Sequence, residues 1–373
     1  MSGAALARRC GQLLSVGFDG HVVPSSLQAR LARGEAGGVM LFRPNIESPP
    51  QVAALVGALR GADPESPVLI SVDQEGGLVQ RLRAPLTVWP DMFSVGAQGD
   101  AVRTEAVGRA LGDELASLGI GWNFAPVLDV HTNPANPVIG NRAFASTAED
   151  VTRHALAFWR GLRAAGLVGC GKHFPGHGDT RTDSHLELPV VDHPPARLRA
   201  VELAPFAAAA AAGIDAIMTA HVMFPSLDAT WPATLSPAIL TTLLREELGF
   251  RGVIVSDDLG MKAVADRWPI EELTVRAVAA GADHLLVREP EARQVAAFEA
   301  LVHEAESSPS FRAQVEASAA RVAALKARVT VGPPATSAAL PSLLGTPAHR
   351  ALAGSFPRVD ASSPAASSPV ASA

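Results

Sequence analysis

The sequence predicts a closed barrel of eight parallel strands, each followed by a helix. Eight short apolar runs alternate with longer segments of helical pattern. Such alternation is typical of parallel strands joined by βα units, and the count of eight indicates a (β/α)8 barrel. Polar residues follow many of the runs, whereas an open doubly wound sheet, the alternative, would concentrate them at one switch point. We therefore expect a single α/β barrel domain.

The expected strands and helices follow one another regularly along the chain. The strands are the apolar runs at residues 13–18, 38–42, 68–72, 122–128, 167–171, 216–219, 253–255 and 284–287. The helices are 49–59, 101–118, 148–165, 196–212, 237–248 and 271–280, and a last helix at 309–329 packs outside the barrel. Gly119, Gly166, Gly213 and Gly249 follow helical segments closely, where a C-terminal cap favours a residue that accepts positive φ.

The two ends of the chain differ from its middle. Arg8 and Arg9 could belong to an export signal, but no apolar stretch with a cleavage site accompanies them, so we expect an amphipathic first helix and no signal peptide. From residue 332 onward Pro, Ser and Ala dominate, and such a segment buries too little apolar surface to offset its ordering entropy. We expect a catalytic barrel at 1–331 and a disordered tail at 332–373, in which 340–344 could dock locally.

Composition narrows the range of partners. The 373 residues carry a net charge of −6 and contain no run of like charge, which argues against a nucleic-acid partner. No segment reaches the ~18 consecutive apolar residues of a membrane span. The two cysteines, Cys10 and Cys170, make no disulfide framework. These features predict a soluble, cytoplasmic monomer that binds neither nucleic acid nor membrane.

The polar segment after the fifth expected strand is the most informative part of the sequence. Residues 172–180 (KHFPGHGDT) and 183–185 (DSH) place three histidines, two aspartates and a lysine within fourteen residues. Because the chain has only three lysines, a lysine at a strand end stands out. Other strand ends carry Asp19, Asp73, Gln74, Glu75, Asp129, His131, His221, Asp257 and Asp258. Since the carboxyl ends of barrel strands face one opening, we expect many of these side chains to share a pocket.

Two kinds of chemistry fit this segment. His173, His177, Asp179, Asp183 and His185 could ligate a metal, since imidazole and carboxylate are zinc ligands, but their spacing matches no strong metal motif. Alternatively, Asp183 orients the imidazole of His185 and raises its pKa, so that it donates a proton near neutral pH. Asp183 as a cap beside an exposed His185 fits the residues equally well. We expect neither a bound metal nor a cofactor.

Two adjacent acids follow the seventh expected strand. If Val253 and Val255 point into the barrel, the strand period of two directs Asp257 to the opening and turns Asp258 toward a helix cap or the backbone. Both acids as helix caps is the alternative. A carboxylate nucleophile opposite a proton donor is the minimal equipment of a retaining glycosidase.

A sugar substrate also needs groups that hold its hydroxyls and orient its ring. Asp73 can accept hydrogen bonds from two hydroxyls, and four cationic or imidazole side chains can donate to others. These four candidates are Arg81, Arg142, Lys172 and His173. The apolar face of a sugar ring needs a platform, for which the candidates are Trp122, Phe124 and Phe174, although packing in the core fits each of them better.

Five motifs taken together resemble a known enzyme family. They are residues 72–77 (VDQEGG) with 79–81 (VQR), 133–144 (NPANPVIGNRAF), 172–180, 183–185 and 256–261 (SDDLGM). In this order, over about residues 10–330, they resemble the β-N-acetylhexosaminidases of glycoside hydrolase family 3. The resemblance implies that Asp257 is the nucleophile, His185 the general acid/base and Asp183 its dyad partner. It further implies that the terminal N-acetylglucosamine is held by Asp73, Arg81, Arg142, Lys172 and His173.

The pattern is similar to the bacterial cytoplasmic, single-domain members of that family. For them, the resemblance implies a substrate of N-acetylglucosamine linked to anhydro-N-acetylmuramic acid, from cell-wall turnover. Larger members carry a second α/β domain with an acid/base glutamate, and we expect none after Val329. Glycines at 176 and 178 predict a mobile loop that brings His185 over the pocket when substrate binds.

Three other functions remain open from the sequence. A phosphorylase could use the same site, because a histidine in place of an anionic carboxylate lets phosphate approach the intermediate. A metal-dependent barrel hydrolase could be built on His173, His177 and Asp179. A non-enzymatic sugar-binding protein is the third, although binding alone requires neither a nucleophile nor an acid.

Overall fold

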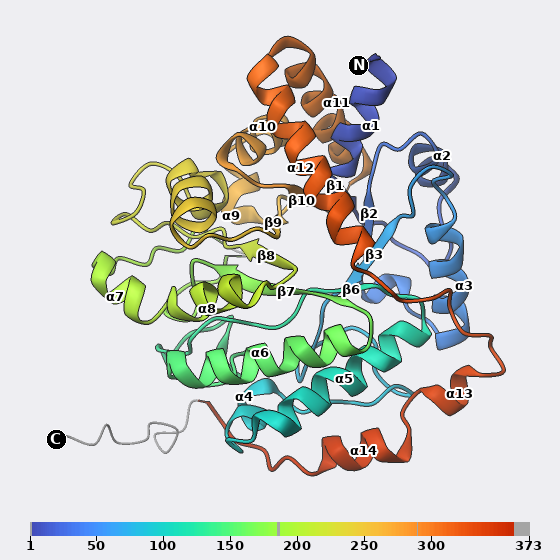
Figure 1. Cartoon of the computed structure of the whole chain (residues 1–373), viewed down its shortest axis with the longest axis vertical. Helices are drawn as coiled ribbons and strands as arrows, with labels where there is room; N and C mark the ends of the chain where they lie inside the picture. The colour runs from blue at the N-terminus through green and yellow to red at the C-terminus, as the bar shows by residue number, and fades with distance from the viewer. Residues whose placement is uncertain (1, 185–186, 289, 362–373) are drawn as a thin grey trace.

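Eight parallel strands close into a barrel (Figure 1). The computed structural model describes residues 2–184, 187–288 and 290–361, and within them the barrel strands follow the order β1-β10-β9-β8-β7-β6-β3-β2. These strands are β1 (Leu14–Val16), β2 (Gly38–Leu41), β3 (Leu69–Val72), β6 (Trp122–Asn123), β7 (Val168–Phe174), β8 (Ala216–Thr219), β9 (Val253–Asp258) and β10 (His284–Val287). A small antiparallel pair, β4 (Gln74–Gly76) and β5 (Val79–Gln80), follows β3. The predicted fold class is confirmed.

Two strands differ in length from the apolar runs that predicted them. The run at 122–128 gives a regular strand only at Trp122–Asn123, because Pro126 has no N–H to donate to a ladder. The amides of β7 nevertheless bond to the carbonyls of Ala125 and Pro126 at 2.8 and 3.2 Å. Strand β7 extends past the predicted end at residue 171 and includes Lys172 and His173. The two polar side chains therefore stand on a buried strand rather than on a loop.

Helices surround the barrel and connect its strands. Between β1 and β6 lie α2 (Ser25–Ala32), η1 (Arg43–Asn45), α3 (Pro49–Arg60), α4 (Met92–Gly96) and α5 (Ala101–Ser117). Between β6 and β9 lie η2 (Gly140–Arg142), α6 (Ala148–Ala164), α7 (Pro195–Ala200), α8 (Ala204–Ala212), η3 (Ala233–Leu235) and the π-helical η4 (Ala238–Glu247). Around β10 lie α9 (Lys262–Ala265), α10 (Ile270–Ala280) and α11 (Glu291–Ser307). The predicted helices at 49–59, 101–118, 148–165, 271–280 and 309–329 form, and 237–248 forms as a π-helix. The helix predicted at 196–212 is wrong as a single element, because the chain breaks at 201–203 into α7 and α8.

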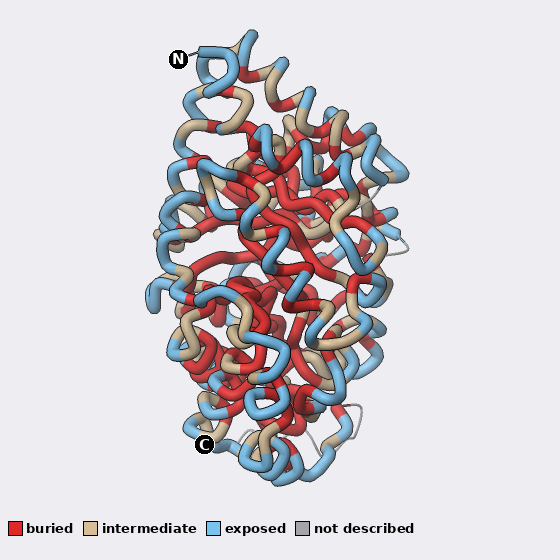
Figure 2. Tube along the Cα trace, turned by 90° about the vertical axis from the view of Figure 1, so that its right-hand side faces the viewer, coloured by how far each residue is buried: buried red, intermediate tan, exposed pale blue. Residues whose placement is uncertain are grey.

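The first and last long helices cover the amino end of the barrel. Helix α1 (Gly3–Gln12) is amphipathic, as predicted: it buries Leu6 and Cys10. Helix α12 (Pro309–Ala327) crosses in front of the strands in Figure 1. Its Val322 and Leu325 join the buried cluster inside the barrel. Figure 2 shows this buried interior surrounded by exposed helices, so the amino end is closed by packing and the site must lie at the carboxyl end.

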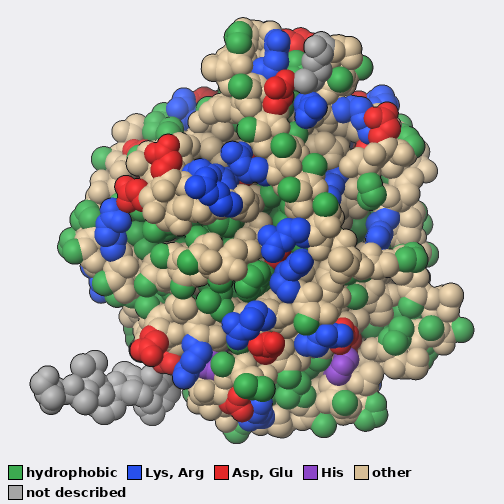
Figure 3. Space-filling model, in the orientation of Figure 1, with side chains coloured by type: hydrophobic (Ala, Val, Ile, Leu, Met, Phe, Trp, Pro, Cys, Tyr) green, Lys and Arg blue, Asp and Glu red, His purple; other side chains and the backbone are tan. Residues whose placement is uncertain are grey.

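Basic side chains gather over the face that α12 crosses (Figure 3). Several arginines reach from this end of the barrel to buried carboxylates: Arg321 and Arg245 bind Asp283 at 2.7 and 2.6 Å, and Arg328 binds Asp215 at 3.0 Å. Both acids directly precede barrel strands, β8 and β10. Because a buried carboxylate is costly without a partner, these arginines stabilise the strand starts, and part of the positive charge is structural.

The expectation of a disordered tail from residue 332 is wrong for residues 332–361. This segment contains α13 (Leu340–Leu343) and α14 (Pro347–Gly354) and packs along α5. Leu340, Leu344 and Phe356 are buried in the main hydrophobic cluster. The Pro-, Ser- and Ala-rich composition hid these few large apolar residues, which bury enough surface to order the segment. Residues 362–373 lie outside the described part of the chain.

The helices were compared with the length and apolar character of a membrane span. Among those that the structure describes, none is both long and apolar enough to cross a bilayer.

Candidate active site

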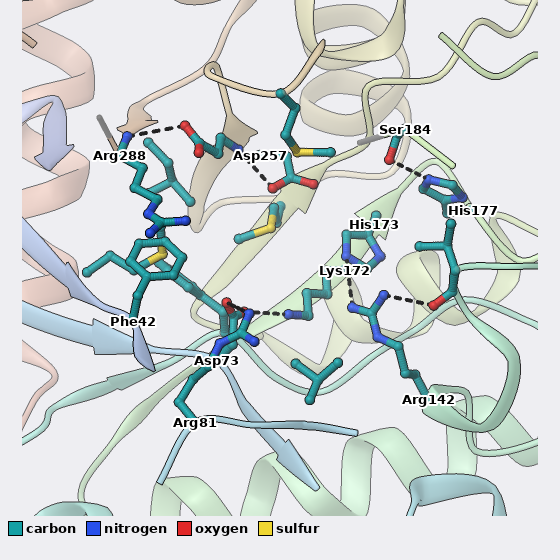
Figure 4. A pocket seen from close by; sticks show the side chains of 18 of the residues that line it. Phe42, Asp73, Arg81, Arg142, Lys172, His173, His177, Ser184, Asp257 and Arg288 are labelled. Atoms are coloured by element: carbon teal, nitrogen blue, oxygen red, sulfur yellow. Dashed lines mark hydrogen bonds and ion pairs between the residues drawn. The ribbon is translucent and has the colours of Figure 1, made fainter. Parts of the chain in front are cut away.

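A pocket of about 340 Å³ opens at the carboxyl ends of the barrel strands (Figure 4). Charged side chains from several strands and loops line it. Six of the predicted site residues are among them: Asp73, Arg81, Arg142, Lys172, His173 and Asp257. The barrel topology brings these residues together from positions up to 184 apart in the chain (257 minus 73), as parallel strands with a common carboxyl end require.

We call the charged wall formed by Asp73, Lys172, Arg142 and His173 the pocket floor. Lys172 lies at its centre. Its ammonium lies 2.8 Å from Asp73 Oδ1 and 2.6 Å from Glu75 Oε1, and its side chain is only 3% exposed. Arg81 binds the other oxygen of the same aspartate, with Nη2 3.2 Å from Asp73 Oδ2. Figure 4 shows Lys172 directed at Asp73 across the pocket. A buried ammonium is stable here because two carboxylates surround it.

Arg142 comes to the same floor from the loop after β6. Its Nε and Nη2 bind both oxygens of Glu75 at 2.9 and 2.8 Å, a bidentate geometry that fixes the plane of the guanidinium. The same Nη2 lies 3.4 Å from His173 Nε2. The sequence reasoning gave Glu75 no role, although it lies two residues after Asp73 at a strand end. The structure makes Glu75 the buried carboxylate that orients both cations.

The ion pairs shift the pKa values of the floor residues. Burial alone would raise the pKa of Asp73, but Lys172, Arg81 and Arg142 together lower it well below its ordinary value. For Glu75 the cations likewise outweigh burial and lower the pKa to about 2. Burial would lower the pKa of Lys172, and the two carboxylates raise it instead. At neutral pH the floor is therefore a set of fixed charges that can bind sugar hydroxyls without changing protonation.

His173 is oriented by a carboxylate that the sequence reasoning did not assign. Asp129 Oδ2 lies 2.7 Å from His173 Nδ1, and the backbone amides of His173 and His177 donate to the same carboxylate. A proton held on Nδ1 by Asp129 leaves Nε2 as the acceptor on the pocket side. Asp129 follows the fourth apolar run, so its place at a strand end was a usable signal.

The two acids after Val255 have different surroundings, as the strand period predicted. Val253 and Val255 lie in the barrel interior, and Asp257 lines the pocket. Asp258 also borders the pocket, but its Oδ1 accepts hydrogen bonds from the amides of Gly260 (2.9 Å) and Arg288 (3.2 Å). Burial raises the pKa of Asp258 despite these amides. The carboxylate of Asp257 is thus the one presented to the pocket from β9.

The loop after β7 carries the predicted acid–base residues. His177 bonds through Nδ1 to Thr180 Oγ1 at 2.7 Å and through Nε2 to Ser184 Oγ at 3.0 Å, and both His177 and Ser184 line the pocket. Asp183 belongs to the described residues, whereas His185 lies outside them. The two hydrogen bonds of His177 therefore bring the loop that leads to His185 to the edge of the pocket.

The alternative metal site does not assemble from the residues proposed for it. His173 bonds to Asp129, His177 to Thr180 and Ser184, and Asp179 to His193 and Thr132. Within the described ranges no three His, Cys, Asp or Glu side chains gather as metal ligands would. The side chains of the three residues bind different partners, although the His173 ring and the His177 amide share Asp129.

Of the aromatic residues considered as sugar platforms, Phe124 lines the pocket. Trp122 packs edge-on against it inside the barrel, with ring centroids 4.8 Å apart, and Phe174 packs against Phe206. The sequence reasoning did not single out the opposite rim, where the Arg288 guanidinium stacks 4.3 Å from the ring centroid of Phe42. No motif marked these two residues, because Phe42 is the last residue of an ordinary apolar run and Arg288 directly follows another.

Known proteins are similar to this chain in both sequence and fold. Residues 5–325 match the glycosyl hydrolase family 3 N-terminal domain. Beta-hexosaminidase A of Pseudoalteromonas piscicida is 38% identical over 360 residues, which are 88% of this chain and 59% of that protein. The beta-hexosaminidase of Methylococcus capsulatus is 40% identical over 285 residues, 76% of this chain and 84% of the relative.

A solved structure agrees with these relatives. The glycoside hydrolase family 3 beta-N-acetylglucosaminidase from Paenibacillus sp. has a TM-score of 0.86 and 42% identity, over 93% of this chain and 67% of that one. The chain thus spans less than two thirds of the first relative's length, while nearly all of its own barrel lies within the matches. By its sequence match and its barrel, the chain belongs to glycosyl hydrolase family 3.

Proposed function

We propose that the protein is a retaining exo-β-N-acetylglucosaminidase that removes terminal β-linked N-acetylglucosamine. One observation carries the proposal: a single pocket is lined by the Asp257 carboxylate on one side and by the charged floor of Asp73, Lys172, Arg142 and His173 on the other. A carboxylate nucleophile beside groups that bind hydroxyls suits glycosyl transfer to the enzyme. The names of the relatives support the N-acetylhexosamine as the sugar.

The floor would hold the terminal sugar. Asp73 accepts hydrogen bonds from sugar hydroxyls, and Arg81, Lys172, Arg142 and His173 Nε2 supply the remaining polar partners. All of these groups are already paired with one another or with Glu75 and Asp129 in the described structure. Their positions are therefore fixed before substrate arrives, which reduces the entropy cost of orienting the ring.

The reaction would follow two steps with inversion at each. In the first, an oxygen of Asp257 attacks C1 of the sugar while the His185 imidazolium, oriented by Asp183, gives its proton to the departing glycosidic oxygen. In the second, neutral His185 takes a proton from water, the water oxygen bonds to C1, and the bond to Asp257 breaks. Ser184 at the pocket edge supports this role for its neighbour. Net retention of configuration follows from the two inversions.

The natural substrate would be a muropeptide fragment in which N-acetylglucosamine is linked to anhydro-N-acetylmuramic acid, as in cytoplasmic cell-wall recycling. This narrower proposal rests on the resemblance of the motifs. Release of N-acetylglucosamine from purified muropeptides, followed by chromatography, tests it. An enzyme that hydrolyses aryl N-acetylglucosaminides but leaves these fragments intact would have a different natural substrate.

The sugar specificity is tested with two aryl glycosides that share one leaving group. We expect the aryl β-N-acetylglucosaminide to be hydrolysed with a kcat/KM at least ~100-fold above that of the aryl β-glucoside, because a site built to bind a polar substituent rejects the analogue that lacks it. Equal rates would contradict the assignment of the sugar.

The catalytic residues are tested separately. A mechanism-based fluorinated sugar should label Asp257, and labelling of another residue would remove it as the nucleophile. His185→Ala should slow substrates with poor leaving groups by ~10²-fold or more, whereas His303→Ala on the exposed surface of α11 serves as the matched control. Unchanged turnover of those substrates by the first variant would contradict the acid/base role.

A phosphorylase is the second candidate, because a neutral histidine does not repel phosphate as a carboxylate would. The two functions differ only in the acceptor of the second step. The partition between free sugar and sugar 1-phosphate at millimolar phosphate distinguishes them, and we expect free sugar to dominate.

A further inference from the structure

The segment after α12 returns from the amino end of the barrel to the neighbourhood of the pocket. We call residues 332–361 the C-terminal strap. It follows α5 through α13 and α14 (Figure 1). Its last residue bonds to Asn141 of η2, the turn that carries Arg142. The family match ends at residue 325, so the strap lies beyond it. A segment outside the matched domain thus reaches a residue of the candidate sugar site.

Buried Glu114 of α5 anchors the middle of the strap. Its Oε1 accepts hydrogen bonds from the amide of Gly345 at 2.9 Å and from His349 Nδ1 at 3.0 Å. The same carboxylate accepts from the amide and hydroxyl of Thr87 at 2.9 and 2.7 Å. Further along, the Arg103 guanidinium covers the Phe356 ring at 4.4 Å from its centroid. These contacts fix the path of the strap up to its last residues.

The end of the strap bridges α4 and η2, the turn that contains Arg142. The amide of Val359 donates to Ser94 Oγ in α4 at 2.9 Å, and the amide of Ala361 donates to Asn141 Oδ1 at 3.0 Å. Asn141 is the residue directly before Arg142. Ala361 is only 5% exposed, so its hydrogen bond to Asn141 is partly buried and is worth more than a fully exposed one.

The loop that carries Arg142 needs this support because its rear is hollow. A cavity of about 570 Å³ lies behind it, separated from the sugar pocket by Val138 and Arg142. Phe356 and Arg358 of the strap form one wall of that cavity. Asn136 ties the start of this loop through the amides of Val138 and Ile139, and with open space at its rear the loop depends further on specific contacts near Arg142. The bonds of Arg142 to Glu75 hold its guanidinium from the front, and the strap binds the side chain of the preceding residue, Asn141, from behind.

We propose that residues 359–361 are a positioning element for Arg142, acting through Asn141. The strap would thereby set the affinity for the sugar while leaving the chemical step at Asp257 untouched. This inference rests on the proposed role of Arg142 in holding the sugar. It assigns a function to a segment whose composition gives no catalytic signal.

The central test removes the hydrogen-bond acceptor and then restores it. Asn141→Ala should raise KM for an aryl β-N-acetylglucosaminide roughly 3- to 10-fold, the range expected for one buried hydrogen bond, with kcat changed less than about twofold. Asn141→Asp keeps an acceptor oxygen at the same position and should return KM to within about twofold of the wild-type value. Thermal unfolding of each variant checks that the barrel remains folded.

Truncation gives an independent measurement. A chain that ends at Ser355 lacks the bridging residues but keeps α14 on α5, and a chain that ends at Ala361 is the matched control. The first should show the raised KM of Asn141→Ala, and the second should behave as the wild type. If both changes act through one contact, Asn141→Ala in the shorter chain should add no further rise in KM, as a double-mutant cycle measures.

Several results would overturn the inference. They are an unchanged KM in Asn141→Ala, a fall in kcat without a rise in KM, additive effects of Asn141→Ala and the truncation, or a wild-type KM in the chain ending at Ser355. A failure of the proposed function looks different, since the wild-type protein itself would then not hydrolyse the N-acetylglucosaminide. Hydrolysis by the wild type with identical KM in all variants would reject the strap alone.

Discussion

Replacing Glu75 by Gln tests the electrostatic basis of the pocket floor. The carboxylate is 2% exposed and binds Lys172 at 2.6 Å and Arg142 through two hydrogen bonds. A glutamine keeps the size of the side chain but removes its charge and turns an amide N–H₂ toward the cations. In the buried site Lys172 would then keep Asp73 as its carboxylate partner, and Arg142 would lose its ion pair with Glu75. We expect loss of stability together with loss of sugar affinity.

Two routes give the same magnitude for the loss of stability. The pKa of Glu75 falls from its ordinary value of 4.5 to about 2 in the folded protein, which corresponds to roughly 3 kcal/mol at neutral pH. Breaking one partner of a buried ion pair costs about 3–5 kcal/mol in general. The expected destabilisation of Glu75→Gln at pH 7 is therefore about 3 kcal/mol, with a fall in Tm of roughly 4 °C for a chain of this size.

The pH dependence carries a definite sign. Because the folded pKa is depressed, the stabilisation by Glu75 is complete above 4.5 and is lost as pH falls toward 2. By pH 3.5, one unit below the ordinary value, roughly 1 kcal/mol of the difference in unfolding free energy between wild type and Glu75→Gln should have disappeared. Carboxylates outside the pocket floor affect both proteins alike, so the difference reports on Glu75 together with Asp73, which shares Lys172 with it.

Urea unfolding at pH 7 and at pH 3.5 measures both quantities. Glu105→Gln is the matched control, because Glu105 also binds an arginine, Arg160 at 3.0 Å, but its side chain is 44% exposed. Exposed pairs contribute about 0–1 kcal/mol, so the control should change little. A destabilisation by Glu75→Gln no larger than that of the control, or one that is equal at both pH values, would refute the argument.

Three further predictions concern the nucleophile and the loop after β7. Asp257→Asn should lower kcat by more than ~10³-fold while leaving the melting temperature nearly unchanged, as kinetics and calorimetry would show. Gly178→Ala would place a Cβ 1.8 Å from the carbonyl oxygen of Val130 and should destabilise the protein by about 1–3 kcal/mol, whereas Gly332→Ala, with nothing within 4 Å, should not. Burial lowers the pKa of His177 from 6.5 to about 4. Between pH 7.5 and 5 the unfolded chain therefore takes up a proton that the folded protein does not, and the free energy of unfolding of the wild type should fall by about 2 kcal/mol. Urea unfolding of His177→Gln should not show this fall.

The barrel could be predicted from the sequence because its strands are buried on both faces. Such strands read as short continuous apolar runs, and helix caps and glycines separate them. The ends of the strands were less well predicted. Polar residues at 172–173 and 257–258 were taken as loop residues, yet they continue β7 and β9. A polar side chain on a strand is compatible with burial when its partners come from other strands, and one chain segment does not reveal such partners.

The same reason limits what could be predicted of the site. Residues of the motifs were found, but Glu75 and Asp129 act through side chains 97 and 44 positions away, Lys172 and His173. Their places at strand ends indicate that they lie near the pocket, but the groups that they hold are far away in the sequence and are not indicated by it. Docking of residues 340–344 was expected, and Leu340 and Leu344 are buried. The rest of the strap was missed for a different reason: its large apolar residues, such as Phe356, are diluted in a polar and small-residue composition. These residues are ordered by packing against α5, a contact that the sequence alone does not reveal.

The two kinds of support around the pocket have different consequences for function. The floor consists of opposite charges buried together on strand ends, so a change in any one of them alters both folding stability and sugar binding. The Arg142 loop is held at its front by Glu75 and at its rear by the strap. Loss of the bond between Ala361 and Asn141 leaves every charge pair of the floor in place. The guanidinium of Arg142 can then move only as far as the loosened backbone of its loop allows. Substitutions in the strap should therefore tune affinity gradually, whereas substitutions in the floor should abolish binding and destabilise the barrel at once.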